Sequence, residues 1–465
     1  MQQNGFKLLL VIIYILLLPV SMFSQEKITL NLQKSVDLAL EKNPGIRIAE
    51  KEVEKARAGV WEAYSTILPK LDASANLQRA WEIQENTIPN FIKPMLGPLA
   101  GVIPELQDMP DFVKISFGLK NTISYGAVVS QPLFLGGAGY AGIKMATAAK
   151  NAAELNLDEQ RQELIFQTAN AFLMTLLAKE VVSVQREALE QAKANLEVVT
   201  KKYEAGMATG FDKMRAEVDV ANLEPTVLSA KNDFEAALTQ LKTVLGLNMS
   251  ADLEIEGQFN FIEDEFGSQT LDQLKNIAFE NRPALLATRY QKNITSSGIT
   301  LARSEFMPKL FFQTDYSFIA MKNDLDVSQD DFSKGFTSAV SLQIPLFHGF
   351  ASTKKYQKAK LDHRIMLDTE KQIYDGISAE VEIGYNNFQV AKENYFSSME
   401  TVELAEEALR LANLMYEEGA NTQLDVLSSQ LSLTQAKLNY LKSLFDYQLA
   451  RYNLRKVTGK LKGIL

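Results

Sequence analysis

The chain of 465 residues contains no cysteine and only two histidines, His348 and His363. The absence of cysteine excludes disulfide bonds, thiolate zinc sites, cysteine nucleophiles and a lipid anchor on an N-terminal cysteine. The two histidines form no metal-binding spacing, and no Ser/His/Asp constellation stands out along the chain. The sequence therefore predicts a protein that is not an enzyme and that uses no metal or other cofactor.

Long apolar runs are also scarce. Leu8–Leu18 is an unbroken apolar run, preceded by Lys7 and followed by Pro19 and by the small residues of Ser21–Ser24. This is the pattern of a secretory signal peptide, which we place at residues 1–24. The alternative is an N-terminal membrane anchor, for which the run is short. The net charge of −9 argues against nucleic acid as a partner.

One stretch occurs twice. Ser124–Ala149 begins as an alternating strand and becomes helical after Gly136 and Gly137. Phe336–Lys360 has the same arrangement, with Pro345-Leu346-Phe347 matching Pro132-Leu133-Phe134. A long repeat that stays in register predicts one architecture built twice.

Each repeat is expected to contain a short helix, two strands, a long helix, a turn and a further helix. We place the first repeat at residues 25–270 and the second at 271–465. In the first repeat we expect helices at 28–42, 44–68, 138–204 and 211–245, and strands at 70–81 and 115–133. In the second we expect helices at 271–280, 351–417 and 422–457, and strands that begin near Leu310 and Phe336.

The last helix shows the clearest periodicity, with positions spaced alternately three and four residues apart. This is a heptad seam, which predicts coiled-coil packing. The seam comprises Leu424, Leu427, Leu431, Thr434, Leu438, Leu441, Phe445, Gln448 and Tyr452.

The four strands each have one apolar and one polar face. In the first strand the apolar positions are Leu71, Ala73, Ala75 and Leu77, and in the third they are Leu310, Phe312, Tyr316 and Phe318. Four strands are too few to close a barrel, and left open they expose their edges. Either the strands form a covered sheet or several chains share one barrel, to which three chains would contribute twelve strands.

Residues 82–114 contain five of the 13 prolines, yet are rich in apolar residues. Proline at this density predicts a long ordered loop without regular structure. The second repeat lacks a counterpart, so the loop is an insertion at an exposed hairpin end. It either covers a barrel mouth or decorates the surface.

Several short motifs occur in the same order in both repeats. They are Ala39-Leu40 with Asn43-Pro44, Leu68-Pro69, Pro132–Gly137, and the Tyr-x-x-Gly motifs at Tyr203 and Tyr416. The run Asp425–Gln430 of the second repeat adds to this set. Their duplicated order resembles the TolC-like outer-membrane efflux protein family, the outer membrane factors of tripartite efflux or type I secretion systems, over nearly all of the mature chain.

The resemblance implies a mainly α fold with a β-barrel contribution, in which long antiparallel coiled-coil helices accompany four strands per chain. It implies a homotrimer with a shared twelve-strand barrel in the outer-membrane lipid and a helical tunnel in the periplasm. It further implies a passive export duct of a tripartite efflux pump, opened at its periplasmic tip by an adaptor (membrane fusion) protein and an inner-membrane pump.

By the same resemblance, the two helix turns form the periplasmic gate. Asp425 matches an acidic constriction residue, and Tyr416 and Asp212 match positions of the gate network. Ser428 stands where the family has a second constriction acid, and Asn421 where it has a gate arginine. We therefore expect weaker contacts holding the gate closed at rest, and a ring of fewer carboxylates at the constriction.

The same turns are the expected docking site of the adaptor, with contacts from Gly206, Met207, Ala208, Gly419 and Ala420. A plainer interpretation fits the acids equally well. Thr209 with Asp212, and Thr422 with Asp425, each match a capping box at a helix start, and the glycines suit the turns themselves.

Two other classes of function are open. A soluble or surface-attached coiled-coil binding protein without a pore would have its strands in a covered sheet. An outer-membrane enzyme on a barrel scaffold lacks any candidate catalytic site. The cargo of a duct is not indicated, since no Met/His-rich tract marks a metal exporter.

Overall fold

The structure is a computed structural model that describes residues 28–96, 109–116, 118–257 and 259–461. The expected signal peptide lies outside these residues. The helices are α2 (Leu32–Lys42), α3 (Pro44–Ser65), α4 (Ile92–Leu96), α5 (Ala138–Glu204), α6 (Gly210–Leu245), α7 (Leu271–Asn281), α8 (Pro283–Arg303), α9 (Ala351–Glu417) and α10 (Gln423–Val457). The strands are β1 (Ile28–Leu30), β2 (Lys70–Arg79), β3 (Glu85–Pro89), β4 (Phe112–Ser116), β5 (Asn121–Phe134), β6 (Leu253–Ile255), β7 (Lys309–Lys322) and β8 (Ser333–Gln343).

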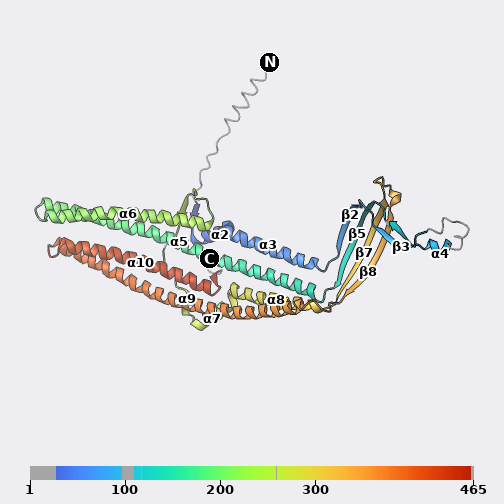
Figure 1. Ribbon diagram of the computed structural model, residues 1–465. Helices are drawn as coiled ribbons and strands as arrows, with labels where there is room; N and C mark the ends of the chain where they lie inside the picture. The colour runs from blue at the N-terminus through green and yellow to red at the C-terminus, as the bar shows by residue number, and fades with distance from the viewer. Residues whose placement is uncertain (1–27, 97–108, 117, 258, 462–465) are drawn as a thin grey trace, which may run out of the picture. The chain divides into compact units, whose positions relative to one another are not determined.

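The long helices α5 and α9 dominate the fold (Figure 1), and each has 67 residues. Their bounds are those expected from the sequence. The mainly helical fold with four longer strands is likewise confirmed. Within the described residues, none of the helices combines the length and the apolar character that crossing a membrane requires.

The chain divides into two compact units. The first comprises Met1–Glu54, Asn151–Tyr290 and Asp368–Leu465, and the second comprises Lys55–Lys150 and Gln291–Leu367. Both sequence repeats contribute residues to each unit, and in the second unit the strands of both repeats join in one sheet.

The second unit contains a four-stranded antiparallel sheet in the order β2-β5-β7-β8. Its register places Ala73 beside Ala127, Ala127 beside Tyr316, and Tyr316 beside Phe336. Because side chains alternate along a strand, this register collects the apolar positions of all four strands on one face. The amphipathic strands expected from the sequence thus form one sheet with an apolar and a polar face.

The described part of the proline-rich insertion contains regular structure, which corrects the expectation of a loop without it. β3 and β4 pair as a two-stranded antiparallel sheet, and α4 follows β3. Pro89 ends β3 in a sheet that has only edge strands, and Pro94 lies in the first turns of α4, so neither proline removes a required hydrogen bond. The strand expected at 115–133 is correspondingly two strands, β4 and β5.

The first unit is built from two helical hairpins, α5 with α6 and α9 with α10 (Figure 1). One apolar cluster lies within the first hairpin and its short helices, a second within the second hairpin, and a third joins the two around Ile165, Phe445 and Tyr452. Phe259, in the linker between the repeats, packs against all three clusters. The linker therefore ties the cores of the two repeats together.

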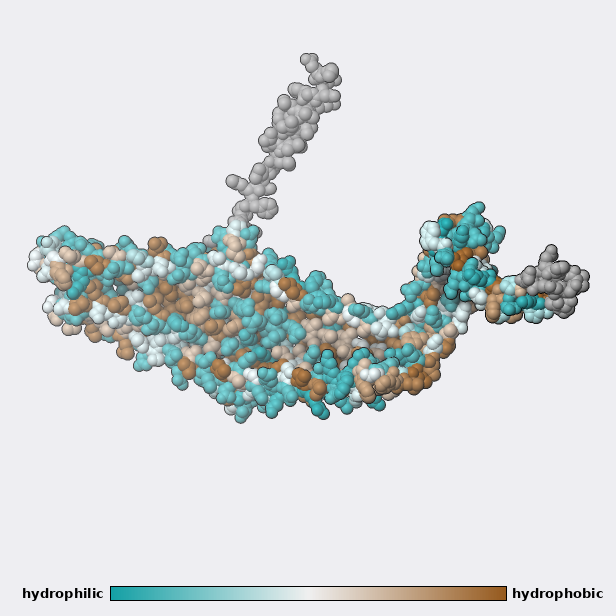
Figure 2. Space-filling view, viewed as in Figure 1, coloured by the Kyte–Doolittle hydropathy of each residue, from teal (hydrophilic) through white to brown (hydrophobic). Residues whose placement is uncertain are grey.

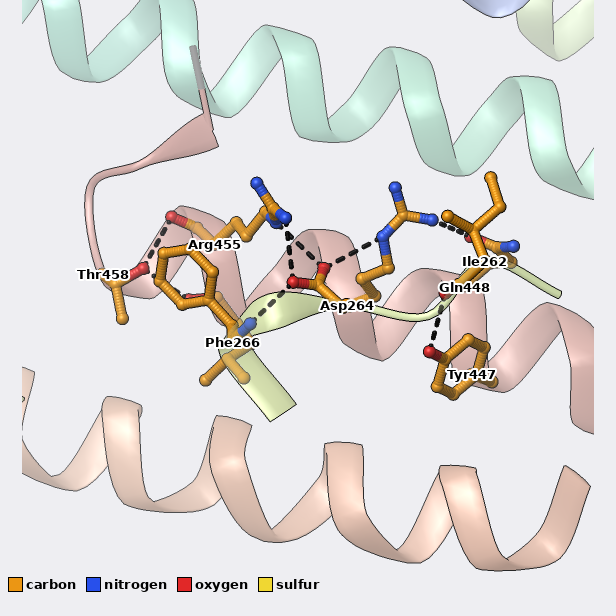
Figure 3. A network of polar contacts seen from close by, with 9 residues as sticks. Ile262, Asp264, Phe266, Tyr447, Gln448, Arg455 and Thr458 are labelled. Atoms are coloured by element: carbon orange, nitrogen blue, oxygen red, sulfur yellow. Dashed lines mark hydrogen bonds and ion pairs between the residues drawn. The ribbon is translucent and has the colours of Figure 1, made fainter. Parts of the chain in front are cut away.

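A polar network fixes this linker to the C-terminal half of α10 (Figure 3). The Tyr447 hydroxyl donates to the Ile262 carbonyl at 2.8 Å. The Asp264 carboxylate accepts from Arg455 at 2.8 and 2.9 Å and from the Nε of Arg451 at 3.0 Å. The side chains of Asp264 and Arg451 are 1% and 5% exposed, so this is a buried ionic group with several hydrogen bonds.

The heptad seam of α10 has two different environments. Its C-terminal positions, Leu441, Phe445, Gln448 and Tyr452, are buried. Leu424 and Leu431, toward the turn, are 54% and 71% exposed. The seam expected from the sequence is therefore packed within one chain along half of its length.

Candidate functional site at the two hairpin turns

Each helical hairpin closes through a five-residue turn with one left-handed glycine, φ 72° at Gly206 and 75° at Gly419. The next residue donates its amide to the carbonyl five residues earlier, at 2.7 Å in the first turn and 2.8 Å in the second. This pairing satisfies the free carbonyls at the end of a helix. A Cβ at either glycine would meet nothing within 4 Å, so the backbone angle is what requires glycine here.

Both turns lead into a helix through a complete capping box. Thr209 accepts from the Asp212 amide at 3.1 Å, and the Asp212 carboxylate accepts from the Thr209 amide at 3.0 Å. Thr422 and Asp425 repeat the arrangement. Hydrogen bonds from the threonine hydroxyls hold the pKa of both carboxyls below the usual range, so both acids are charged at neutral pH.

Tyr416 lies half-buried between the two turns. The Lys202 ammonium stands 3.9 Å from the centroid of its ring and also donates to its backbone carbonyl at 3.2 Å. Burial raises the pKa of the Tyr416 phenol, and the negative charge of Asp212 raises it further. The structure thus brings together Tyr416 and Asp212, both expected from the sequence, and adds Lys202.

Sequence reasoning missed Lys202 because Lys201 and Lys202 look alike at the end of a helix. Only the three-dimensional arrangement separates them. Lys201 pairs with Glu197 along α5 at 2.6 Å, whereas Lys202 reaches across to the second hairpin.

Asn421, Asp425 and Ser428 lie apart from this cluster in the contacts that they make. The Asn421 side chain accepts from the amide of Thr422 at 3.1 Å, a contact within the turn itself. Asp425 and Ser428 have exposed side chains, and their spacing of three residues places them on one face of α10. The arrangement leaves a carboxylate and a hydroxyl facing outward at the start of the helix.

The turn residues expected to dock a partner are mostly accessible. Met207 is 73% exposed, Gly419 and Ala420 are exposed, and Ala208 is half-buried. The first turn of α6 adds Phe211 and Met214, which are 64% and 62% exposed and were not singled out from the sequence. A helix start with several exposed large apolar side chains is the signal that would have identified them.

Gln423, the first residue of α10, is an exception among the residues of the turns. It is 4% exposed, yet neither its amide nitrogen nor its amide oxygen has a hydrogen-bond partner. An unpaired buried amide is unfavourable by about 1–3 kcal/mol. Across the described residues, no group of three or more acidic or histidine side chains is arranged to hold a metal ion.

Comparison with known proteins gives a consistent result. The profile of a family described as outer membrane efflux protein matches residues 35–247 and 274–460. The alkaline protease secretion protein AprF of Pseudomonas aeruginosa is 22% identical over 443 residues, which cover 94% of this chain and 86% of AprF. The cobalt-zinc-cadmium resistance protein CzcC of Cupriavidus metallidurans is 22% identical over 439 residues, which cover 93% of this chain and 90% of CzcC.

The fold is also similar to solved structures. The outer membrane channel CmeC of Campylobacter jejuni superposes with a TM-score of 0.75 at 19% sequence identity. The superposition covers 92% of this chain and 86% of that channel. At this level of identity the similarity concerns the fold.

Proposed function

Because the chain belongs to the outer membrane efflux protein family, we propose that it forms a homotrimeric export duct, opened at the two hairpin turns by a periplasmic adaptor and an inner-membrane pump. Family membership itself makes the protein an outer-membrane efflux channel with a periplasmic extension, and not an enzyme. The alternative of a soluble coiled-coil protein without a pore is therefore wrong.

The main support for a trimer is the sheet of the second unit. This sheet has one apolar face and two unpaired edges. All ten residues of β2 and all eleven of β8 are exposed. Because neighbouring strands are antiparallel, β8 of one copy runs opposite to β2 of the next, as an antiparallel ladder requires. Three copies would close a twelve-strand barrel with its apolar face toward lipid.

Exposed apolar side chains on the helices of the first unit support the same assembly, and Figure 2 shows apolar residues dispersed over the helical surface. Ile383, Val390, Leu404 and Leu411 of α9 lie at multiples of seven residues and are 43–66% exposed. Heptad spacing of this kind fits a partner helix rather than water. A second copy of the chain is the partner that would cover them.

We assign the gate to Asp425, Ser428, Tyr416, Asn421 and Asp212. Three Asp425 carboxylates around one axis would favour cations at the entrance, which the capping role does not prevent, since the carboxylate is exposed.

The adaptor would dock on the exposed turns, through Gly206, Met207, Ala208, Gly419 and Ala420. Phe211 and Met214 extend this surface on the first turn. Together with Met207 they are 62–73% exposed, whereas Leu424, the large apolar residue at the start of α10, is 54% exposed. We therefore expect the first turn to contribute more of the hydrophobic contact with the adaptor.

The duct is proposed to be generic with respect to cargo. AprF and CzcC, which match this chain with the same identity, are named for protease secretion and for metal resistance. Cargo choice would then reside in the pump and the adaptor.

The duct is tested by single-channel conductance of the purified protein in planar bilayers. Wild type should give discrete, cation-selective steps, and Asp425→Asn should lose cation selectivity, because the ring of charge at the constriction is removed. Asp212→Asn is the comparison variant, because it weakens the same kind of capping box in the other turn, at a residue assigned to the gate network and not to the constriction.

Three outcomes are informative. Equal loss of selectivity in both variants would mean that selectivity depends on the charge of both turns and not on a ring of Asp425 carboxylates. Unchanged selectivity in Asp425→Asn would place the constriction elsewhere. Absence of any conductance from a well-folded wild-type trimer would contradict the duct.

The shared barrel is tested separately by cross-linking, for which a chain without cysteine is well suited. Ser74→Cys on β2 and Thr337→Cys on β8, combined in one chain, should give dimers and trimers with a thiol cross-linker. The two single variants are the controls, because each offers only one of the two edges. A double variant that stays monomeric in the native membrane would contradict the barrel.

A further inference from the structure

Lys202 connects the two helical hairpins at their turns, although it belongs to neither the capping boxes nor the glycine turns. We propose that Lys202 is the positioning residue that holds the tip of the second hairpin against the first and keeps the entrance narrow. This inference rests on the proposed function of the turns as a gate.

The second hairpin is anchored to the first at its base and contacts it again near its tip. At its base, α10 is fixed by the Asp264 network and by a core shared with the first repeat (Figure 3). Beyond that base, polar contacts between the hairpins in the described residues come from two lysines. Lys437 pairs with Glu187 at 2.9 Å, and Lys202 contacts Tyr416. The tip is thus held by Lys202 far beyond the anchored base.

The Lys202 side chain contacts Tyr416 in more than one way. The ammonium meets both the face of the Tyr416 ring, at 3.9 Å, and the Tyr416 carbonyl, at 3.2 Å. Tyr416 is the penultimate residue of α9, so this carbonyl belongs to the negative end of the helix dipole. One cation therefore makes a cation–π contact, a hydrogen bond and a favourable dipole contact with the other hairpin.

Position 421 holds no cation that could act as a lock. Asn421 stands where the family resemblance implies a gate arginine, and its side chain serves its own turn. Asp212 lies close enough to act on the Tyr416 phenol. Lys202 thus supplies, from the first hairpin, the cation that position 421 lacks.

The start of α10 contains an unsatisfied polar group. Gln423 begins α10 seven residues after Tyr416 and is buried with an unpaired amide. A buried group that would gain hydrogen bonds on exposure favours release of the tip. The Lys202 contact opposes this release. Loss of the contact should therefore shift the equilibrium between the closed and the open entrance toward the open one.

The test is the open probability of single channels from Lys202→Met, compared with wild type and with two further variants. Met keeps the length of the side chain and removes the charge, so we expect open probability at rest to rise about fivefold. Lys202→Arg keeps the cation and should stay near wild type. Lys201→Met, one residue away on the same helix, should also stay near wild type, because Lys201 pairs only along α5.

The outcomes separate this inference from the proposed function. If wild type conducts and Lys202→Met has the same open probability, the duct stands and the role of Lys202 is wrong. If Lys201→Met opens the channel equally, the effect is one of surface charge and the role of Lys202 is again wrong. If wild type does not conduct at all, the proposed function itself fails.

Discussion

The two halves of α10 share one continuous helix but have opposite surroundings. In the C-terminal half, Tyr447 is fully buried and Arg451 is 5% exposed against the Asp264 carboxylate. In the N-terminal half, Leu424 and Leu431 are more than half exposed, although this half shares a small buried apolar cluster with α9. The base is thus specified by buried polar groups that reach the linker, whereas the tip has a small apolar cluster within its own hairpin and few polar contacts with the other hairpin.

Two glycines with nearly the same φ angle, one at each end of α10, show the same difference between base and tip. Gly459, just beyond α10, has φ 74°, and a Cβ there would lie 2.7 Å from the backbone of Asn281. Gly419, in the turn before α10, has φ 75°, and a Cβ there would meet nothing within 4 Å. The base is closely packed and the tip is open, so a conformational change at the entrance is least restricted at the tip.

The largest expected effect comes from breaking the anchor at the base. Asp264→Asn leaves two arginines without their shared carboxylate, and removing one partner of a buried ion pair is unfavourable by about 3–5 kcal/mol. Glu187→Gln removes one of the two carboxylate partners of Lys437 at the partly exposed contact toward the tip, and such a contact is worth about 0–1 kcal/mol. The midpoint of thermal unfolding, followed by circular dichroism, should fall far more in the first variant.

If both variants lowered the melting midpoint equally, the difference between base and tip would be disproved. If neither did, the Asp264 network would contribute specificity of the fold rather than stability.

Substitution of the two glycines by alanine tests the same difference between base and tip, with a smaller expected loss of stability. Gly419→Ala should lower stability by about 1–2 kcal/mol, the penalty for a left-handed conformation with a Cβ. Gly459→Ala should lower it by about 1–3 kcal/mol more, because its Cβ also overlaps the backbone of the α7–α8 junction. Denaturant unfolding of the two variants side by side isolates the packing contribution, and equal losses would mean that the base can relax around the added methyl group.

The sequence was sufficient for the features that depend on periodicity. The 67-residue bounds of α5 and α9 followed from strand-to-helix changes at the glycine turns, and the apolar faces of the four strands followed from simple alternation. These patterns are local, and each is strengthened by being present twice. The capping boxes were likewise visible, because Thr and Asp three residues apart form them without help from the rest of the fold.

Other features depend on tertiary contacts between segments that are distant in the sequence. Local sequence patterns do not predict such contacts. The Asp264 network joins a linker to a helix more than 180 residues later, and nothing local distinguishes Asp264 from Glu263. Lys202 differs from Lys201 by helical phase alone. The proline-rich insertion was misjudged because Pro89 and Pro94 occupy a strand end and a helix start, where proline is tolerated.

The smallest expected effect tests the tip directly. Gln423→Leu replaces a buried, unpaired amide with an apolar side chain of similar size, and such an exchange stabilises a protein by up to about 1 kcal/mol. The melting midpoint should rise slightly and open probability at rest should fall, because the closed tip no longer contains an unsatisfied group. Gln435→Leu is the control, since that glutamine is exposed and already donates to Asn439 at 2.9 Å. A fall in stability of Gln423→Leu below that of Gln435→Leu would mean that the Gln423 amide is satisfied in the assembled duct, and the tip would then be locked more firmly than its contacts within one chain indicate.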